Sequence, residues 1–209
     1  MITLTAKITL ADGTAYEVNK RNILYLDSEI VDRGDISMPS VGIISNRGSL
    51  RFVDFDGTID HLITTEGLSE NYKCELFLMD TLSKVETSMG VFYATDWQYD
   101  GNSKEVSVTL ADDLMEWQDI EYNAKDNSGE ITAYEIYDIF VQYYVPPKWE
   151  FMPLDAKTLQ VLEEYKISNV YWNKTNLWAL FNKLCEACGL HIFKNRDNKV
   201  VVSYDFRSE

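Results

Sequence analysis

Cys185 and Cys188 form a C-x-x-C motif, the spacing that redox-active cysteines and many zinc sites use. The motif falls near the end of a predicted helix, whereas a low thiolate pKa is favoured at a helix start. A zinc site would also need a second pair of ligands, for which the sequence offers Cys74, His61 and His191. We therefore interpret the pair as two small apolar residues on a helix face and keep redox or metal chemistry as the alternative.

The acidic segment Asp54-Phe55-Asp56-Gly57 is a second candidate for metal chemistry, because it resembles half of a calcium-binding loop. The preceding Asp and the following Glu that a full loop requires are missing from the sequence. Asp and Gly are common turn-forming residues, so the segment predicts a turn after a strand. His61 follows Asp60 without a nucleophile motif nearby, and the two residues are interpreted as a surface pair.

Motifs of the common catalytic classes are missing from the sequence. It contains no Gly-rich phosphate loop, no G-x-S-x-G, no H-E-x-x-H and no dinucleotide-binding fingerprint. Its two histidines give acid–base catalysis little support. Two of its 34 acidic residues could serve a glycosidase, but the sequence singles out no pair. The sequence therefore predicts no enzyme, no cofactor, and no catalytic, cofactor-binding or metal-binding residue.

The composition restricts the partners of the chain. Its 209 residues carry a formal net charge of −15, which disfavours nucleic-acid backbones and anionic lipid, and no basic patch offsets this charge. No apolar run approaches the roughly 18–20 residues of a membrane-spanning helix, and the first residues lack the pattern of a signal peptide. These features predict synthesis in the cytoplasm, no membrane partner and no sequence-specific nucleic-acid binding.

The clearest structural pattern runs from Gly90 to Trp117. It predicts a strand that begins at Gly90, a turn in which Gly101 and Asn102 can take positive φ, a returning antiparallel strand, and a short helix capped by Asp112 or Asp113. The residues expected to share a face are Val91, Tyr93, Thr95 and Trp97 in the first strand, Val106, Val108 and Leu110 in the second, and Leu114, Met115 and Trp117 in the helix.

The residues before this pattern predict further strands. Asp12-Gly13 predicts a hairpin turn, whose first arm carries Ile2, Leu4, Ala6 and Ile8 on one face and whose second arm continues through residues 22–26. Residues 27–40 predict a loop, and the tripeptide Arg33-Gly34-Asp35 within it receives no functional weight. The other expected elements are a strand at 41–44, a turn at 45–49, a strand at 50–53, a short helix around 59–63, a strand at 73–79 and a turn at 80–84.

The residues after Trp117 predict three helices and a final hairpin. A break is expected at Asn127-Ser128-Gly129, and Thr132 with Glu135 forms a capping box for the first helix, which ends before Pro146. Its core face is expected to carry Ile136, Ile139, Phe140 and Tyr143, and the second helix carries Leu159, Val161, Leu162 and Tyr165. An extended piece at 170–172 precedes the third helix, which is capped by Thr175 or Asn176 and ended by Gly189, and the last hairpin turns at Arg196-Asp197-Asn198.

Two of these stretches together resemble a protein family. They are the unit from Gly90 to Trp117 and the segment TNLWALFNKLCEACGLHIFKNRDNKVVVS at 175–203, in which a helix is followed by a hairpin. Their order resembles the baseplate hub proteins of phage tails, the late-control-D type, and NILYLDSEIVDRGDISMPSVGIIS and GSLRFVDFDG also resemble phage and prophage tail proteins. The chain departs from the family at Asp197-Asn198-Lys199, where Asp-Gly is common, and in its length, because hub proteins commonly continue into further domains.

The resemblance implies an α+β fold with two domains. Residues 1–119 would form a β-rich, barrel-like domain of the tail-tube type, and residues 120–209 an α+β domain of three helices and a terminal β-hairpin. The resemblance further implies a homo-oligomeric ring, with a trimer favoured, that joins the tail tube to a spike, fibre or lysin in the virion tail and contacts other tail proteins. A negatively charged lumen would let DNA pass without binding.

Four residues carry the resemblance, namely Phe92, Trp97, Asp112 and Trp117, and we expect them to be structural. We also expect edge strands and exposed aromatic residues in the first half to pair with neighbouring subunits. The alternative from another class is a module that binds or hydrolyses carbohydrate. Such a module would show Trp or Tyr platforms beside two carboxylates at glycosidase spacing.

Overall fold

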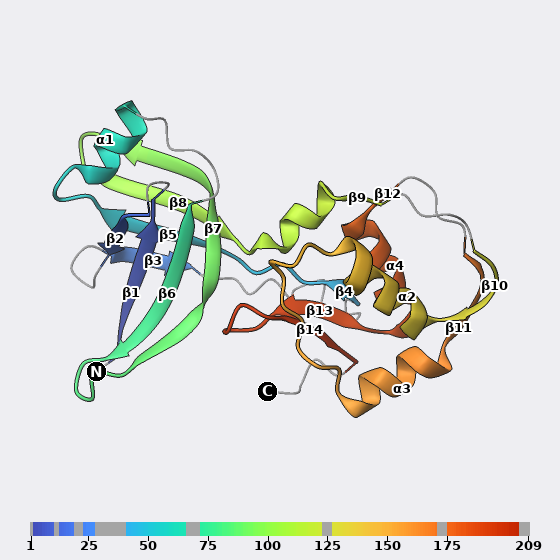
Figure 1. Ribbon diagram of the computed structural model, residues 1–209. Coiled ribbons are helices and arrows are strands. Elements are labelled where there is room, and N and C mark those ends of the chain that lie inside the picture. The colour runs from blue at the N-terminus through green and yellow to red at the C-terminus, as the bar shows by residue number, and fades with distance from the viewer. Residues whose placement is uncertain are drawn as a thin grey trace. The chain divides into compact units, whose positions relative to one another are not determined.

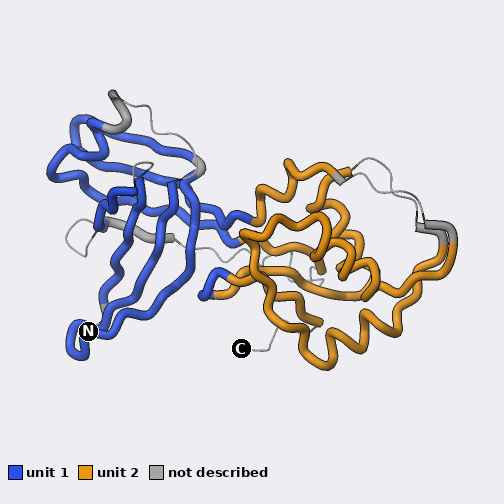
Figure 2. Tube along the Cα trace, viewed as in Figure 1, with its two compact units in different colours: residues 1–30, 46–113, 196–198 blue, residues 31–45, 114–195, 199–209 orange. Residues whose placement is uncertain are grey.

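The computed structural model describes residues 2–10, 13–18, 23–27, 41–65, 72–122, 127–170 and 175–204. The chain divides into two compact units, which Figure 2 shows in different colours. Unit 1 comprises Met1–Ile30, Asn46–Asp113 and Arg196–Asn198, and unit 2 comprises Val31–Ser45, Leu114–Asn195 and Lys199–Glu209. The division into a domain of residues 1–119 and a domain of residues 120–209 stays a prediction.

Unit 1 is built on one antiparallel sheet of seven strands. In sheet order the strands are β2 (Ala15–Val18), β1 (Ile2–Thr9), β6 (Lys73–Asp80), β7 (Glu86–Asp100), β8 (Glu105–Ala111), β5 (Arg47–Val53) and β3 (Ile23–Asp27). Figure 1 shows this sheet curled into an open half-barrel, with helix α1 (Thr58–Thr65) at one end. The predicted barrel-like antiparallel module is therefore confirmed.

The long strand β7 contains two irregularities that the alternation of its residues did not predict. Its pairing with β6 shifts between Leu76 and Phe77, and its pairing with β8 shifts between Ala94 and Asp96. Because the second bulge inserts one residue, the core-facing set changes from even to odd positions: Phe92 and Ala94 are buried, and beyond the bulge Trp97 packs on the same core. Gly90 lies inside the strand with φ +132° instead of opening it.

The hairpin turns on either side of β7 have the same construction. In each, the first Asp accepts hydrogen bonds from the backbone N–H two residues on and from a Ser hydroxyl, and a Lys takes a positive φ. The residues are Asp80, Leu82, Ser83 and Lys84 in one turn, and Asp100, Asn102, Ser103 and Lys104 in the other. The positive φ expected at Gly101 or Asn102 therefore lies at Lys104.

Two predictions in the first half were wrong in their connections. Ile23–Asp27 does not continue the first hairpin but forms β3, which pairs with β5 at the opposite edge of the sheet. The expected turn at 45–49 is largely strand, because β5 begins at Arg47. The short helix, the strand at 73–79 and the turns at 54–57 and 80–84 are confirmed. Asp12 and the loop with Arg33-Gly34-Asp35 lie outside the described residues.

Unit 2 combines helices with three small sheets. The helices are η1 (Asp113–Gln118), α2 (Ala133–Ile139), η2 (Phe140–Tyr144), α3 (Ala156–Glu164) and α4 (Leu177–Cys188), where η1 starts at the last residue of unit 1. The sheets pair β10 (Asn127–Thr132) with β11 (Lys166–Val170), β9 (Glu121–Tyr122) with β12 (Thr175–Asn176), and β13 (His191–Lys194) with β14 (Val200–Ser203) and β4 (Gly42–Ile43). The three predicted helices and the final hairpin are confirmed, and with unit 1 they make an α+β fold.

The ends of the unit 2 helices follow the predicted signals. Thr132 and Glu135 form the capping box of α2, and the Asn176 side chain accepts the Ala179 N–H at the start of α4. Gly189 ends α4 with φ +70°, a conformation that costs glycine little. The expected break at residues 127–129 is instead the start of β10.

Tyr143 is 74% exposed, although helical spacing placed it in the core. The reason is that α2 runs into η2, a π-helix, and a wider turn rotates the following side chains off the buried stripe. Ile136 and Phe140, which precede or begin this turn, are buried as expected. The core of unit 2 is strongly aromatic: Trp117 stacks on Phe181 with ring centroids 4.8 Å apart and meets Trp149 edge-on at 5.9 Å.

Strand β4 is a short addition to the β13 edge of unit 2. It runs parallel to β13, where the Gly42 N–H donates to Leu190 and the Ile44 N–H to Ile192. The remaining outward donor, the Ile43 N–H, is taken by the Asn182 side chain of α4 at 2.8 Å. A Cβ on Gly42 would lie 2.6 Å from Asn182 Oδ1, so glycine is needed for this close approach.

Candidate assembly interface

The two edges of the unit 1 sheet are the most prominent unpaired features of the described residues. Strands β2 and β3 each have a neighbour on one side within the sheet. In the β1–β2 hairpin the Leu10 N–H donates to Thr14, and hydrogen-bonded pairs recur at every second residue of an antiparallel ladder. The backbone N–H and C=O groups of Ala15 and Glu17 therefore point away from β1, where an incoming strand can pair with them.

Strand β2 is braced by a buried carboxylate. The Tyr16 hydroxyl donates to Asp54 Oδ1 at 3.1 Å, and the Tyr16 ring lies 6.2 Å from that of Phe52. Asp54 also accepts the Asp60 N–H at the start of α1, at 2.9 Å. Strand β2 is thus held by the Tyr16 side chain as well as by its backbone hydrogen bonds to β1. A strand that is already ordered loses less conformational entropy when a partner strand pairs with it.

Exposed apolar side chains in unit 1 gather at its turns. Leu82 and Val85 are 85% and 58% exposed at the β6–β7 turn, and Phe55 is 62% exposed between Asp54 and Asp56. The backbone of both segments is held by hydrogen bonds to an Asp side chain, from Asp60 N–H to Asp54 and from Leu82 N–H to Asp80. Single exposed apolar residues are normal on protein surfaces, so these turns mark an interface only together with the unpaired strand edges.

The four residues that carried the resemblance occupy structural positions. Phe92 and Trp97 pack on the core of unit 1, and Trp117 is fully buried in unit 2. The Asp112 carboxylate accepts the Asn46 N–H at 2.7 Å, while the Asp112 N–H donates to Asn46 at 2.9 Å. Asp112 therefore links the end of β8 to the start of β5 in unit 1 and is itself buried.

The residues that could have supported chemistry are not brought together. Cys185 and Cys188 are buried on α4, and burial raises the pKa of Cys188 to about 11 and raises that of Cys185 as well, which opposes thiolate chemistry. Burial likewise raises the pKa of Cys74 to about 12. His61 is exposed on α1, and His191 is buried on β13 of the other unit. Within the described ranges, no group of three or more His, Cys, Asp or Glu side chains is placed to hold a metal ion.

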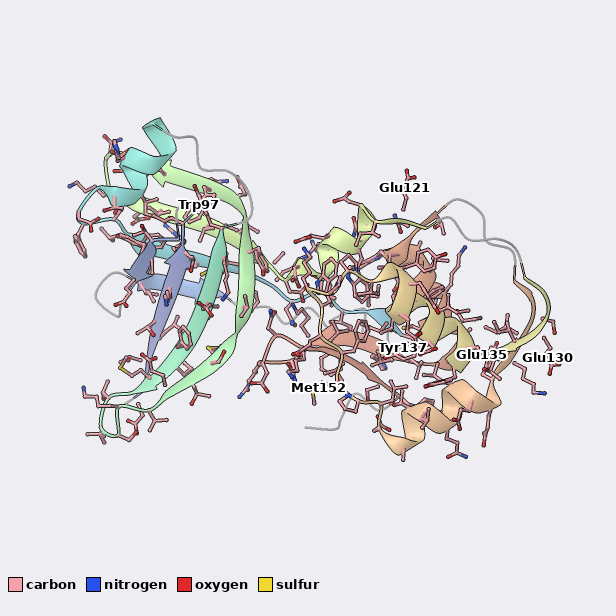
Figure 3. The ribbon with its side chains drawn as sticks, viewed as in Figure 1. Trp97, Glu121, Glu130, Glu135, Tyr137 and Met152 are labelled. Atoms are coloured by element: carbon pink, nitrogen blue, oxygen red, sulfur yellow. The ribbon has the colours of Figure 1, made fainter. Side chains whose placement is uncertain are left out.

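The large aromatic residues of the unit 2 core are buried and therefore cannot serve as platforms for carbohydrate. Trp117 and Trp149 are 0% and 4% exposed, and Tyr137 lies in the interior of unit 2 (Figure 3). Carboxylates such as Glu121 and Glu130 extend from the periphery of the same unit, away from these rings (Figure 3).

Sequence reasoning missed two side chains that fix short strands, one in each unit. Tyr16 and Asn182 gave no signal, because each acts on a residue far along the chain, Asp54 and Ile43. The turn motif D-x-x-S-K, which occurs at 80–84 and again at 100–104, could have been found in the sequence. It would have shown that Leu82 is apolar where the other turn carries the polar residue Asn102.

Comparison with known proteins identifies the fold. No protein-family model and no curated protein matches the chain. The crystal structure of a tail protein from Neisseria meningitidis MC58 matches with a TM-score of 0.56 at 10% identity, over 99% of this chain and 52% of that one. A 43 kDa tail protein of prophage MuSo2 from Shewanella oneidensis matches with a TM-score of 0.55 at 10% identity, over 97% and 55%.

A third solved structure has a similar fold. A chain of the Francisella PdpA–VgrG complex, half-lidded, matches with a TM-score of 0.52 at 14% identity, over 96% of this chain and 30% of that one. This chain thus spans about half the length of the two tail proteins that it matches. In the part of the chain that the structure describes, no helix is long and apolar enough to cross a membrane. The fold of this chain is the fold of phage and prophage tail proteins, as its sequence resemblance implied.

Proposed function

We propose that the chain is a structural component of the tail tip or baseplate of a phage or prophage. The observation that carries this proposal is a fold shared with two tail proteins over 97–99% of the chain. The sequence resemblance to baseplate hub proteins narrows the position from the tail in general to its tip. The place of action is then the virion tail, after synthesis in the cytoplasm of the bacterial host.

We propose further that copies of the chain assemble as a closed ring. Among the described strands, the unit 1 sheet ends in two different edges, β2 and β3, and a head-to-tail contact between different edges generates a ring when the rotation closes. A trimer is the size that the family resemblance implies. Such a ring would join the tail tube to a spike, fibre or lysin.

The other partners in this proposal are tail proteins. One structure of similar fold belongs to a complex, PdpA–VgrG, and this supports a role for this chain in contacts with other proteins. The role is mechanical and assigns no catalytic residue, no cofactor and no metal to the chain. A net charge of −15 suits a ring through which DNA passes, because the lumen would repel phosphate.

Light scattering of the purified full chain over a range of concentrations tests the ring. The variant Glu17→Pro removes one outward-facing N–H of β2, while the β1 ladder keeps its hydrogen bonds at Tyr16 and Val18. The matched control Glu17→Gln removes the charge and keeps the donor. We expect wild type and Glu17→Gln to form a discrete oligomer. On dilution, the Glu17→Pro oligomer should dissociate at a higher protein concentration than the wild-type oligomer. A wild type that is monomeric at every concentration contradicts the ring.

A further inference from the structure

Tyr16, Asp54 and Asp56 meet at one hydroxyl group. The Tyr16 hydroxyl lies 3.1 Å from Asp54 Oδ1 and 3.5 Å from Asp56 Oδ1. Asp54 is fully buried and its other oxygen accepts the Asp60 N–H, while Asp56 Oδ1 also accepts the Thr58 N–H. The three side chains therefore connect edge strand β2, the end of β5 and the first turn of α1.

The Tyr16 hydroxyl offers one hydrogen to two carboxylate oxygens, one from Asp54 and one from Asp56. A phenol carries one O–H, and two ionised carboxylates offer acceptors only. With both carboxylates ionised, Tyr16 can satisfy Asp54 or Asp56 but not both, and two negative charges share the site. One additional proton on the Asp54 carboxyl supplies the missing donor and removes one of the two charges.

Among the described residues, the groups that act on the pKa of Asp54 and Asp56 include no basic side chain. The Asp60 backbone N–H of α1 donates to Asp54, and the negative charges of Asp60, Asp54 and Asp100 act on the Tyr99 hydroxyl of β7. Lys104 contacts this region through its backbone, where its carbonyl accepts the Asp54 N–H at 2.9 Å. His61, the next titratable residue of α1, is exposed.

The direction of the pKa changes agrees with the geometry. Burial, followed by the effect of Asp56, raises the pKa of Asp54, against the hydrogen bonds from Asp60 and Tyr16 that lower it. Partial burial also acts to raise the pKa of Asp56, but hydrogen bonds from Thr58 and Asp54 outweigh it and lower the pKa. Burial and the two carboxylates raise the pKa of Tyr16, so this hydroxyl keeps its proton.

We propose that Tyr16, Asp54 and Asp56 form a proton-binding latch, which takes up one proton in mildly acidic solution and then holds edge strand β2 and the start of α1 more firmly. The proton binds at Asp54, the buried member, and Asp56 stays ionised at the rim. The latch follows from contacts inside unit 1 and does not require the proposed ring.

The sign of the pH effect follows from the raised pKa of Asp54. The folded chain binds this proton more tightly than the unfolded chain, so the stabilisation is present below the ordinary aspartate pKa of about 3.9 and is lost as the pH rises through the raised value. Asp56 acts in the opposite direction, because its lowered pKa removes stability as the pH falls below the ordinary value. The net stabilisation is therefore greatest in acidic solution, between the lowered pKa of Asp56 and the raised pKa of Asp54.

Carboxyl-carbon NMR titration of the ¹³C-labelled full chain measures the latch directly. Comparison with Asp54→Asn assigns the Asp54 signal, which we expect to titrate above the ordinary value of about 3.9. In Tyr16→Phe, which keeps both carboxyl groups, the Asp54 pKa should move still higher, because a hydrogen bond to the ionised form is lost. An Asp54 signal that titrates at or below the ordinary value, or one that moves down in Tyr16→Phe, overturns the proposal.

Thermal unfolding gives a second, independent readout. Asp54→Asn mimics the protonated carboxyl, so its melting temperature relative to wild type should be higher at about pH 7 than at about pH 5. The matched control is Glu17→Gln, which removes one exposed negative charge from β2, the strand that carries Tyr16. The difference in melting temperature between Glu17→Gln and wild type should change little between about pH 5 and about pH 7. Equal pH dependence for Asp54→Asn and Glu17→Gln would show that Asp54 binds no additional proton on folding.

Discussion

At the scale of single residues, the two turns that flank β7 act as an internal comparison. Both use an Asp side chain, a Ser hydroxyl and a Lys with positive φ, at 60° for Lys84 and 58° for Lys104. The third position differs: it is Leu82 in one turn and Asn102 in the other. Since the same backbone forms with a polar residue, folding does not require an apolar side chain at that position.

Replacement of Leu82 by Asn, the residue of the matching turn, should leave the free energy of unfolding within about 0.5 kcal/mol of wild type. The reason is that Leu82 is 85% exposed and buries little apolar area. Urea denaturation measures this difference. Asp80→Ala serves as the contrasting variant, because it removes the side-chain acceptor for Leu82 and Ser83 and should lower the midpoint. A marked loss of stability in Leu82→Asn would mean that Leu82 has a role in the core.

At the scale of elements, helix ends depend on particular capping side chains. The sequence left Thr175 and Asn176 as alternative caps for α4. In the structure Asn176 accepts the Ala179 N–H at 2.9 Å, which satisfies one of the free donors of the first turn. The position of the cap therefore sets where the helix begins.

The substitution Asn176→Ala should destabilise the chain by about 1 kcal/mol, the usual cost of a lost N-cap. The matched control Thr175→Ala removes the neighbouring polar side chain and leaves the cap intact, so its cost should be smaller. Both can be measured by chemical denaturation followed through circular dichroism. If Thr175→Ala proved the more costly variant, the cap would have been assigned to the wrong residue.

Much of this element structure could be predicted because its signals are local. Capping boxes, the Gly189 end of α4 and the alternation in β8 depend on residues within a few positions of one another. The bulge that moves Trp97 to the core side and the π-helix that exposes Tyr143 each insert one residue, and periodicity carries no mark of an insertion. The pairing of β3 with β5, and the Tyr16 hydroxyl at Asp54, depend on contacts across the chain, which local patterns do not contain.

At the scale of the whole molecule, the chain divides its burial between two cores of different character. The core of unit 1 alternates along strands and is mainly aliphatic, whereas the core of unit 2 is centred on Trp117, Trp149 and Phe181. The surface that encloses both is strongly acidic, with 34 acidic against 19 basic residues. Folding is thus supported by two local cores, while association between copies must overcome a repulsion that belongs to the whole chain.

This repulsion gives a prediction for the salt dependence of the proposed ring. If the ring is held by backbone pairing at β2 and β3, its attraction depends little on salt, whereas the repulsion between copies that each carry −15 is screened by it. The fraction of oligomer should therefore rise as ionic strength increases from about 0.01 M to about 0.15 M, where the Debye length falls from about 30 Å to about 8 Å. Sedimentation equilibrium of the full chain measures this fraction, and sucrose in place of salt is the control for non-ionic effects. Dissociation by added salt would show instead that ion pairs hold the copies together, and the edge strands would lose their assigned part in assembly.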